Sequence, residues 1–291
     1  MELPIDVIPS EKKPKDKRLD KMKYKDTLPA HPANICILGR CGSGKTCCLY
    51  SMLNTGYVTD KGKSIFDEMI VFLGTMDAVQ AFQNLPCDNV VVLNEFDPVA
   101  FEQYINDLKD HQMERLNKGK PALNVAIIFD DFAGKSLMKP IARGKSSPLE
   151  HLLITSRHEC NATIMYCSQA YKNNGFSTPI ARNNMTQYII YGMSKAEMEK
   201  VAEEHCGDMT EQEFLDWYDS VMRTKHNFVM INYKKPLEER YTERFTKIYR
   251  PDRFRLLSTR NAEKTATPGS DKQPAVRPAK EIPEAGGKGT N

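Results

Sequence analysis

Residues 34–53 read NICILGRCGSGKTCCLYSML, and this stretch decides the fold. Its apolar run at 35–38 lies between Pro32 and Gly39 and predicts a short buried strand. The next eight residues fit G-x-x-x-x-G-K-[ST] at every fixed position, and 47–53 continues without glycine or proline, as a helix would. A strand, a glycine loop and a helix in this order predict a phosphate-binding loop, although a glycine-rich turn can also match by chance.

The types of residue in this loop suit a nucleoside triphosphate. Lys45 can reach the β- and γ-phosphates, and the hydroxyl of Thr46 can ligate Mg²⁺. Gly42 and Gly44 allow the backbone to turn its N–H groups toward the phosphates. The expected nucleotide-binding residues are Gly39, Arg40, Cys41, Gly42, Ser43, Gly44, Lys45, Thr46 and Cys47. The sequence therefore predicts an ATP site that uses Mg²⁺ as cofactor.

Apolar runs alternate with helical segments along the rest of the chain. Strands are predicted at 35–38, 67–73, 89–93, 122–129, 162–167, 187–191 and 227–233. Helices are predicted at 78–84, 99–116, 149–157, 195–205 and 211–223. The expected buried anchors of the longest helix are Val99, Ile105, Leu108 and Leu116. Thr210 is the expected N-cap of the last helix. This alternation predicts an α/β fold with a mostly parallel sheet, helices on both faces, and the ligand at the carboxyl ends of the strands.

A length of 291 residues allows one large domain with tails. We expect a basic extended arm over 1–31, a P-loop ATPase domain over 32–256, and a disordered tail rich in Pro, Gly and Lys over 257–291. The net charge of +3 permits a nucleic-acid partner without requiring one. Eight Lys or Arg side chains gather in 11–25, where contact with phosphates and simple solvation are both open readings.

Composition also indicates where the protein acts. We see no apolar run near the roughly 20 residues that cross a bilayer, and no apolar signal-peptide core at the N-terminus. Eight cysteines without a CxxC pair fit a reducing compartment. We expect an intracellular protein with no membrane span and no metal site beyond nucleotide-bound Mg²⁺.

Two adjacent acids follow the apolar run NVAIIF at 124–129. In P-loop enzymes the first such acid holds the Mg²⁺ shell and a second can polarise the attacking water, so we assign Asp130 to the metal and Asp131 to the water. The alternative is a pair of exposed acids that caps a turn. The acids also begin D-x-x-G, a GTPase motif, but no N-K-x-D follows downstream and the guanine reading is rejected.

Three further side chains are candidates for phosphoryl transfer. Gln169 follows the strand predicted at 162–167 and can contact the γ-phosphate or the lytic water, although a plain strand-end glutamine fits equally. Arg157 and Arg182 are candidates for the positive charge that stabilises the transition state. The residue type alone does not separate either arginine from a solvated one.

The ordered set of motifs resembles a known family. The phosphate loop, IIFDD at 127–131, SRH at 156–158, a strand ending in Gln169, and PIARNN at 179–184 are similar to the genome-packaging ATPases of large double-stranded DNA viruses. These occur in poxviruses, giant viruses and virophages and belong to the FtsK–HerA superfamily. The resemblance covers roughly 34–235, and the set is more specific than the first two motifs alone.

The resemblance implies a RecA-like core that assembles into a homo-oligomeric ring and drives double-stranded DNA into a preformed capsid. It matches Lys45, Asp131, Gln169, Arg157 and Arg182 to catalytic positions of the family. The second acid of the family is often glutamate, so the shorter Asp131 departs from the pattern. It further implies a capsid or portal-vertex partner and activity at the viral assembly site, with the virion as a second location.

Two alternatives from other classes remain. A nucleotide or small-molecule kinase would need an arginine-rich lid and an acceptor pocket, and the sequence offers no clear candidate for either. A nucleotide-dependent assembly scaffold would bind ATP without cleaving it, which the acids and Gln169 argue against. For DNA contact, the candidates are the basic side chains of one loop, Lys135, Lys139, Arg143 and Lys145.

Overall fold

A nine-stranded sheet forms the centre of the part of the chain that the structure describes. The computed structural model describes residues 14–132, 137, 146–172 and 178–249. Within them the strand order is β3-β2-β4-β5-β1-β6-β7-β8-β9. The strands from β3 to β6 are parallel, and β7, β8 and β9 add antiparallel pairs at one side.

The elements follow the predicted alternation closely. The strands are β1 (Asn34–Leu38), β2 (Glu68–Leu73), β3 (Val90–Leu93), β4 (Val125–Asp130), β5 (Ala162–Ser168), β6 (Gln187–Ile190), β7 (Val229–Asn232), β8 (Tyr241–Glu243) and β9 (Lys247–Ile248). The α-helices are α1 (Lys17–Asp20), α2 (Lys45–Ser51), α3 (Val79–Gln83), α4 (Pro98–Asn117), α5 (Pro148–Thr155), α6 (Pro179–Asn183), α7 (Lys195–His205) and α8 (Glu211–Met222). A π-helical turn (Met52–Gly56) extends α2, and 3-10 turns lie at Met76–Ala78 and Leu237–Glu239.

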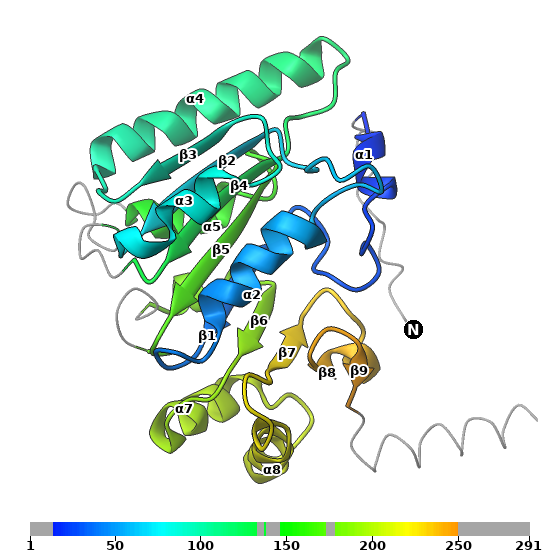
Figure 1. The fold of residues 1–291 in the computed structure, drawn as a ribbon, viewed down its shortest axis with the longest axis vertical. Helices are drawn as coiled ribbons and strands as arrows, with labels where there is room; N and C mark the ends of the chain where they lie inside the picture. Colours follow the sequence, from blue (N-terminus) through cyan, green and yellow to red (C-terminus); the bar gives the residue numbers. More distant parts are fainter. Residues whose placement is uncertain (1–13, 133–136, 138–145, 173–177, 250–291) are drawn as a thin grey trace, which may run out of the picture. The chain divides into compact units, whose positions relative to one another are not determined.

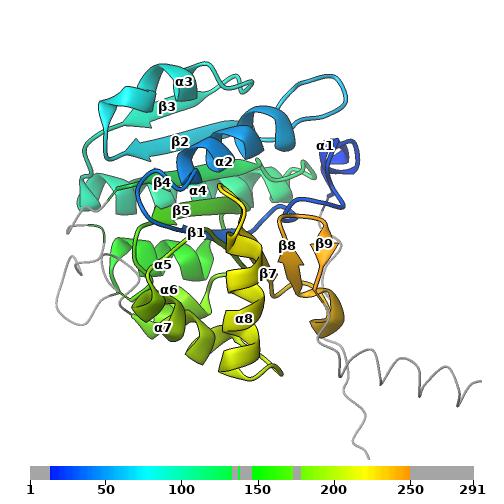
Figure 2. The same ribbon diagram turned by 60° about the horizontal axis from the view of Figure 1, so that its bottom comes forward.

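Helices cover both faces of the sheet. Alternate side chains of each buried strand point to opposite faces, so each face carries apolar side chains that must be buried. One core joins the strands to α4, α5, α7 and α8, and the other joins them to α2, its π-helical turn and α3. Figure 2 shows α2 and α3 on one side of the sheet and α5, α7 and α8 on the other. The predicted α/β class, with a mostly parallel sheet and helices on both faces, is confirmed.

The longest helix buries a different face from the predicted one. Val99 is 64% exposed and its prediction as an anchor is wrong, and Leu116 is only half-buried. The helix starts at Pro98 behind the Asp97 cap, whose side chain accepts from two backbone N–H groups. The buried face then carries Phe101 and Gln112 together with the two anchors that were correctly predicted, Ile105 and Leu108.

The N-terminal segment differs from the extended arm that we expected over 1–31. Within it, residues 14–31 contain α1 and place Met22 and Leu28 in the core beside α2, with 6% and 9% of their surfaces exposed. The guanidinium of Arg18 donates to both carboxylate oxygens of Asp67, at 2.9 and 2.7 Å, and to Asp16. Because lysines dominate this segment, these few anchoring residues were not recognised from the sequence. Figure 1 shows α1 apart from the other helices, beyond the amino end of the sheet.

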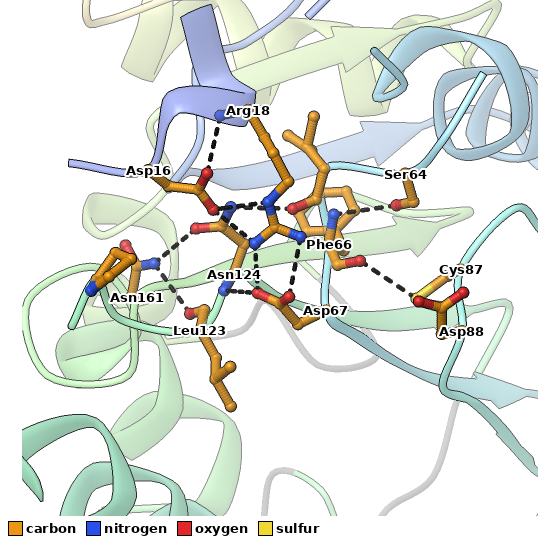
Figure 3. A network of polar contacts seen from close by, with 12 residues as sticks. Asp16, Arg18, Ser64, Phe66, Asp67, Cys87, Asp88, Leu123, Asn124 and Asn161 are labelled. Carbon is orange, nitrogen blue, oxygen red and sulfur yellow. Dashed lines mark hydrogen bonds and ion pairs between the residues drawn. The ribbon is translucent and has the colours of Figure 1, made fainter. Parts of the chain in front are cut away.

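Asp67 and Asn124 connect this segment to the amino end of the sheet (Figure 3). The backbone N–H of Asn124 donates to Asp67 at 2.8 Å, and its side-chain amide donates to Asp16 and to the carbonyl of Ile65. The amide of Asn161 donates to the Asn124 oxygen at 2.9 Å. The residues that precede β2, β4 and β5 are thus joined in one hydrogen-bonded network.

None of the helices within the described ranges is both long enough and apolar enough to cross a lipid bilayer. The expected domain boundary near 256 and the expected disordered tail lie outside the described residues, and both stay predictions.

Candidate functional site

The glycine loop connects β1 to α2, as the motif predicts. Gly42 and Gly44 have φ angles of 71° and 106°, in the region that favours glycine. The N–H of Ser43 donates to the carbonyl of Arg40 at 3.2 Å, which closes a turn over residues 40–43 of the loop. A Cβ at Gly39 would lie 2.6 Å from the Ser43 hydroxyl, so the close turn also needs glycine there.

The ammonium group of Lys45 lies inside the curve of the loop. Its Nζ donates to the carbonyls of Gly39 and Arg40 at 2.7 and 3.1 Å, and the side chain is 6% exposed. A P-loop lysine contacts the β- and γ-phosphates from this position. The fold of the loop therefore places the Lys45 ammonium group where the phosphates of the nucleotide are predicted to lie.

Most of the predicted nucleotide-binding residues line one cavity of about 790 Å³. The exceptions are Gly39 and Arg40, which shape the loop from behind. Cys41 and Cys47 are exposed at the cavity. Asp131 lines the same cavity, although it is 85 residues from Thr46 in the sequence.

Asp130 is the last residue of β4 and is 5% exposed. Burial raises the pKa of its carboxyl group, while hydrogen bonding to Thr46 and Cys167 and the charge of Lys45 act in the opposite direction. Its Oδ1 is buried and has no hydrogen-bond partner among the described residues. An unsatisfied buried carboxylate oxygen calls for an explanation, and a bound ion is one.

This arrangement fits the predicted magnesium ion. Mg²⁺ prefers oxygen ligands and is usually held by one or two carboxylates together with substrate phosphates. Asp130 supplies a free carboxylate oxygen, and Thr46 supplies a hydroxyl within hydrogen-bond reach of the same carboxylate. The predicted ligands Thr46 and Asp130 therefore both offer oxygen atoms that suit Mg²⁺.

Asp131 and Gln169 meet at the carboxyl end of the sheet. The side-chain amide of Gln169 donates to both carboxylate oxygens of Asp131, at 2.8 and 2.9 Å. Asp131 has a φ of 50°, and its carbonyl oxygen would lie 2.2 Å from a Cβ at Gly74, the residue after β2. Three neighbouring strand ends thus fix the orientation of one exposed carboxylate.

Arg157 and Arg182 lie at the other end of the sheet. Arg157 precedes β5, Arg182 precedes β6, and these strands run parallel to β1, whose carboxyl end carries the loop. Both arginines line a second cavity of about 700 Å³ with Glu204, His205 and Lys234, among other residues. Arg182 Nε donates to Glu204 at 2.8 Å. Within one chain, neither arginine reaches the phosphate loop.

Burial and neighbouring side chains shift the pKa values of two residues in this second cavity. Burial and the neighbouring Arg157 lower the pKa of Lys234 to about 8. Burial alone would raise the pKa of Glu204, but hydrogen bonds from Tyr171, Arg182 and Lys172 lower it to about 2. The cavity thus carries cationic side chains beside one firmly ionised carboxylate.

Sequence reasoning missed the rest of the first cavity wall. Beyond α2 and the π-helical turn, it is formed by side chains of the N-terminal segment and at β6 and the strands that follow it: Tyr24, Thr27, Leu28, Tyr191, His226, Phe228 and Phe245. His226 Nδ1 lies 3.2 Å from the carbonyl oxygen of Ser43. The signals in the sequence were the strands predicted at 187–191 and 227–233, since β8 and β9 are too short to show a period.

Comparison with known proteins identifies one matching family. The Poxvirus A32 protein family matches residues 20–234, which is more than half of the chain. The match includes the loop, both acids, Gln169 and both arginines. Comparison with curated proteins gave no match.

Comparison with solved structures gave matches of low identity. The DNA-packaging ATPase from Sulfolobus Turreted Icosahedral Virus has 15% identity and a TM-score of 0.48, over 76% of this chain and 98% of its own. The genome packaging NTPase from Sulfolobus turreted icosahedral virus 2, in complex with ATP-gammaS, has 14% identity and a TM-score of 0.43, over 76% and 97%. The pCW3 conjugation coupling protein TcpA has 15% identity and a TM-score of 0.47, over 79% and 65%.

Proposed function

The chain belongs to the Poxvirus A32 protein family, and we propose that this ATPase couples ATP hydrolysis to the movement of double-stranded DNA into a viral capsid. The observation that carries the proposal is the meeting of Lys45, Asp130 and the Asp131–Gln169 pair around one loop. The family membership agrees with the resemblance of the sequence to genome-packaging ATPases of large DNA viruses.

The residues divide the work of hydrolysis between them. Lys45 binds the β- and γ-phosphates. Thr46 and Asp130 would hold Mg²⁺, which would supply positive charge beside the phosphates. Gln169 holds the carboxylate of Asp131 toward the cavity, where Asp131 orients the attacking water and accepts its proton. A kinase or a scaffold needs no carboxylate positioned for water, so the Asp131–Gln169 contact favours hydrolysis over both alternatives.

The position of the arginines supports a ring of identical subunits. Because Arg157 and Arg182 lie at the amino end of the sheet, they can stabilise phosphoryl transfer only on the nucleotide of a neighbouring chain. An arginine supplied in this way is worth about 10³ to 10⁵ in rate. We assign the cavity that both arginines line to the face that meets the neighbour.

Contact with DNA and capsid rests on the sequence. The candidate DNA-binding side chains, Lys135, Lys139, Arg143 and Lys145, lie outside the described residues. We propose that they contact DNA phosphates in the lumen of the ring, that a capsid or portal-vertex protein anchors the ring, and that the motor acts at the viral assembly site in the host cell and accompanies the virion.

The test is steady-state phosphate release from ATP, with and without linear double-stranded DNA, at low and physiological salt. We expect hydrolysis that DNA stimulates and that salt weakens, because contacts to phosphates release counterions. Hydrolysis indifferent to DNA would contradict the motor. Transfer of phosphate to an added nucleoside or nucleotide would favour the kinase instead.

Mixing experiments test the arginines. Arg157→Ala or Arg182→Ala subunits, titrated into wild-type protein, should silence wild-type neighbours if one of the two acts in trans. Loss of activity in simple proportion to the mutant fraction would contradict a trans role. Lys172→Ala, which removes another partner of Glu204, is the matched control for disturbance of the second cavity.

A further inference from the structure

The cavity at the phosphate loop continues well beyond the loop itself. In addition to the loop and Asp131, it is lined by the end of α2, the π-helical turn, the N-terminal segment and the antiparallel side of the sheet. Its volume of about 790 Å³ falls within the ~300–1,000 Å³ typical of small-molecule sites. A triphosphate alone would fill only the end at the loop.

Aromatic side chains form one wall of this extension. The ring centroids of Tyr191 and Phe228 are 5.1 Å apart, and those of Phe228 and Phe245 are 5.0 Å apart. Phe228 is buried, with 7% of its surface exposed, whereas Phe245 is half-buried and lies at the cavity. The three rings lead from the loop toward the hairpin of β8 and β9.

The N-terminal segment supplies Tyr24 and Leu28 to the same cavity. Tyr24 is 40% exposed, and Leu28 packs so tightly on the π-helical turn that a Cβ at Gly56 would lie 2.5 Å from its Cδ1. The ion pair between Arg18 and Asp67 holds this segment on the domain. Two segments at opposite ends of the described chain therefore meet at one apolar space.

Contacts fix the position of the extension relative to the phosphate loop. His226, two residues before Phe228, contacts the Ser43 carbonyl through Nδ1 at 3.2 Å. Leu28 packs on the turn that continues α2, which itself begins at Lys45. A ligand whose anionic end lies in the loop must place its other end against these side chains.

We propose that Tyr24, Leu28, Phe228 and Phe245 form the binding site for the base and ribose of the nucleoside triphosphate. The occupant follows from continuity, because residues 41–48 and these four side chains line a single cavity. A planar base stacks on aromatic rings and loses contact with water there. The inference rests on the proposed function, since it assigns the remainder of the same nucleotide.

The experiment compares ATP with inorganic tripolyphosphate, each with Mg²⁺, by calorimetric titration of the full chain. Tyr24→Ala and Phe245→Ala should each weaken ATP binding about ten-fold, which is the scale of one lost stacking contact, and leave tripolyphosphate binding unchanged. Tyr24→Phe keeps the ring and should bind ATP as the wild type does. Ile248→Ala, a 41% exposed residue of β9 outside this cavity, is the matched control.

A second measurement does not depend on how tightly tripolyphosphate binds. The fluorescence of 2-aminopurine riboside triphosphate should be quenched by saturating wild-type protein and be partly restored by Tyr24→Ala and Phe245→Ala, since stacking causes the quenching. Unchanged quenching and unchanged ATP affinity in both variants would overturn this inference alone. Failure of the wild type to bind both ATP and tripolyphosphate would overturn the proposed function as well.

Discussion

At the amino end of the sheet, Asp67 accepts two hydrogen bonds from Arg18 and one from the backbone of Asn124. At the carboxyl end, by contrast, Asp130 has a buried oxygen with no hydrogen-bond partner among the described residues. Asp67 directly precedes β2 and Asp130 ends β4, and these two strands are neighbours in the sheet. The amino end ties the N-terminal segment to the domain (Figure 3), while the carboxyl end surrounds an open cavity.

The difference separates polar residues that stabilise the fold from those available for chemistry. A satisfied network lowers the energy of one structure and leaves nothing for a ligand to bind. At the carboxyl end, the free oxygen of Asp130 and the positive φ of Asp131 both raise the energy of the folded state. Such unfavourable features persist mainly at functional sites. Substitutions in the hydrogen-bonded network of Asp67 and Asn124 should therefore change stability, and substitutions around the phosphate loop should change activity.

The largest expected effect is at the carboxyl end. Lys45→Ala should reduce ATP hydrolysis at least about 100-fold, because it removes the cation that the phosphates meet. Steady-state phosphate release measures the loss. Lys195→Ala, whose side chain is 87% exposed on α7, is the control. Near-normal turnover by Lys45→Ala would mean that the reacting site is elsewhere.

Asp131→Asn should slow hydrolysis by about 100-fold and keep ATP bound, since an amide cannot accept the proton of water. Single-turnover cleavage together with nucleotide affinity separates the two effects. Asp77→Asn changes an exposed carboxyl outside the site and should do neither. An unchanged rate of cleavage would remove Asp131 as the base.

At the amino end, Asn124→Ala should cost about 2–3 kcal/mol of unfolding free energy, because it leaves buried partners of a connected network unsatisfied. Urea unfolding measures this loss, with the exposed Asn117→Ala as control. Hydrolysis per folded molecule should stay near wild type. A rate loss comparable with that of Asp131→Asn would break the distinction between the two ends.

The smallest effect concerns pH at the second cavity. Because interactions lower the pKa of Glu204 from 4.5 to about 2, its stabilisation is present above pH 4.5 and is lost as the pH falls toward 2. Glu204→Gln should therefore lose stability at pH 7 and differ less from the wild type near pH 3. Urea midpoints at both values test this sign, and a difference independent of pH would contradict it.

The sequence by itself determined the phosphate loop, the acids at the end of β4, the α/β class and the extents of α7 and α8. These features depend on consecutive residues: a fixed spacing of glycines, an apolar run that ends in acids, or a cap such as Thr210 before a helix. Their physical requirements are local, so they can be predicted without knowing which segments become neighbours.

Only the tertiary structure decided which distant residues meet. The contact of Gln169 with Asp131 depends on the strand order that places β5 beside β4, and the joining of Tyr24 and Phe245 at one cavity depends on a short hairpin without a detectable period. Parallel register also placed Arg157 and Arg182 at the end opposite the loop. Continuous apolar runs predict strands that are buried on both faces, but they leave the order of the strands open.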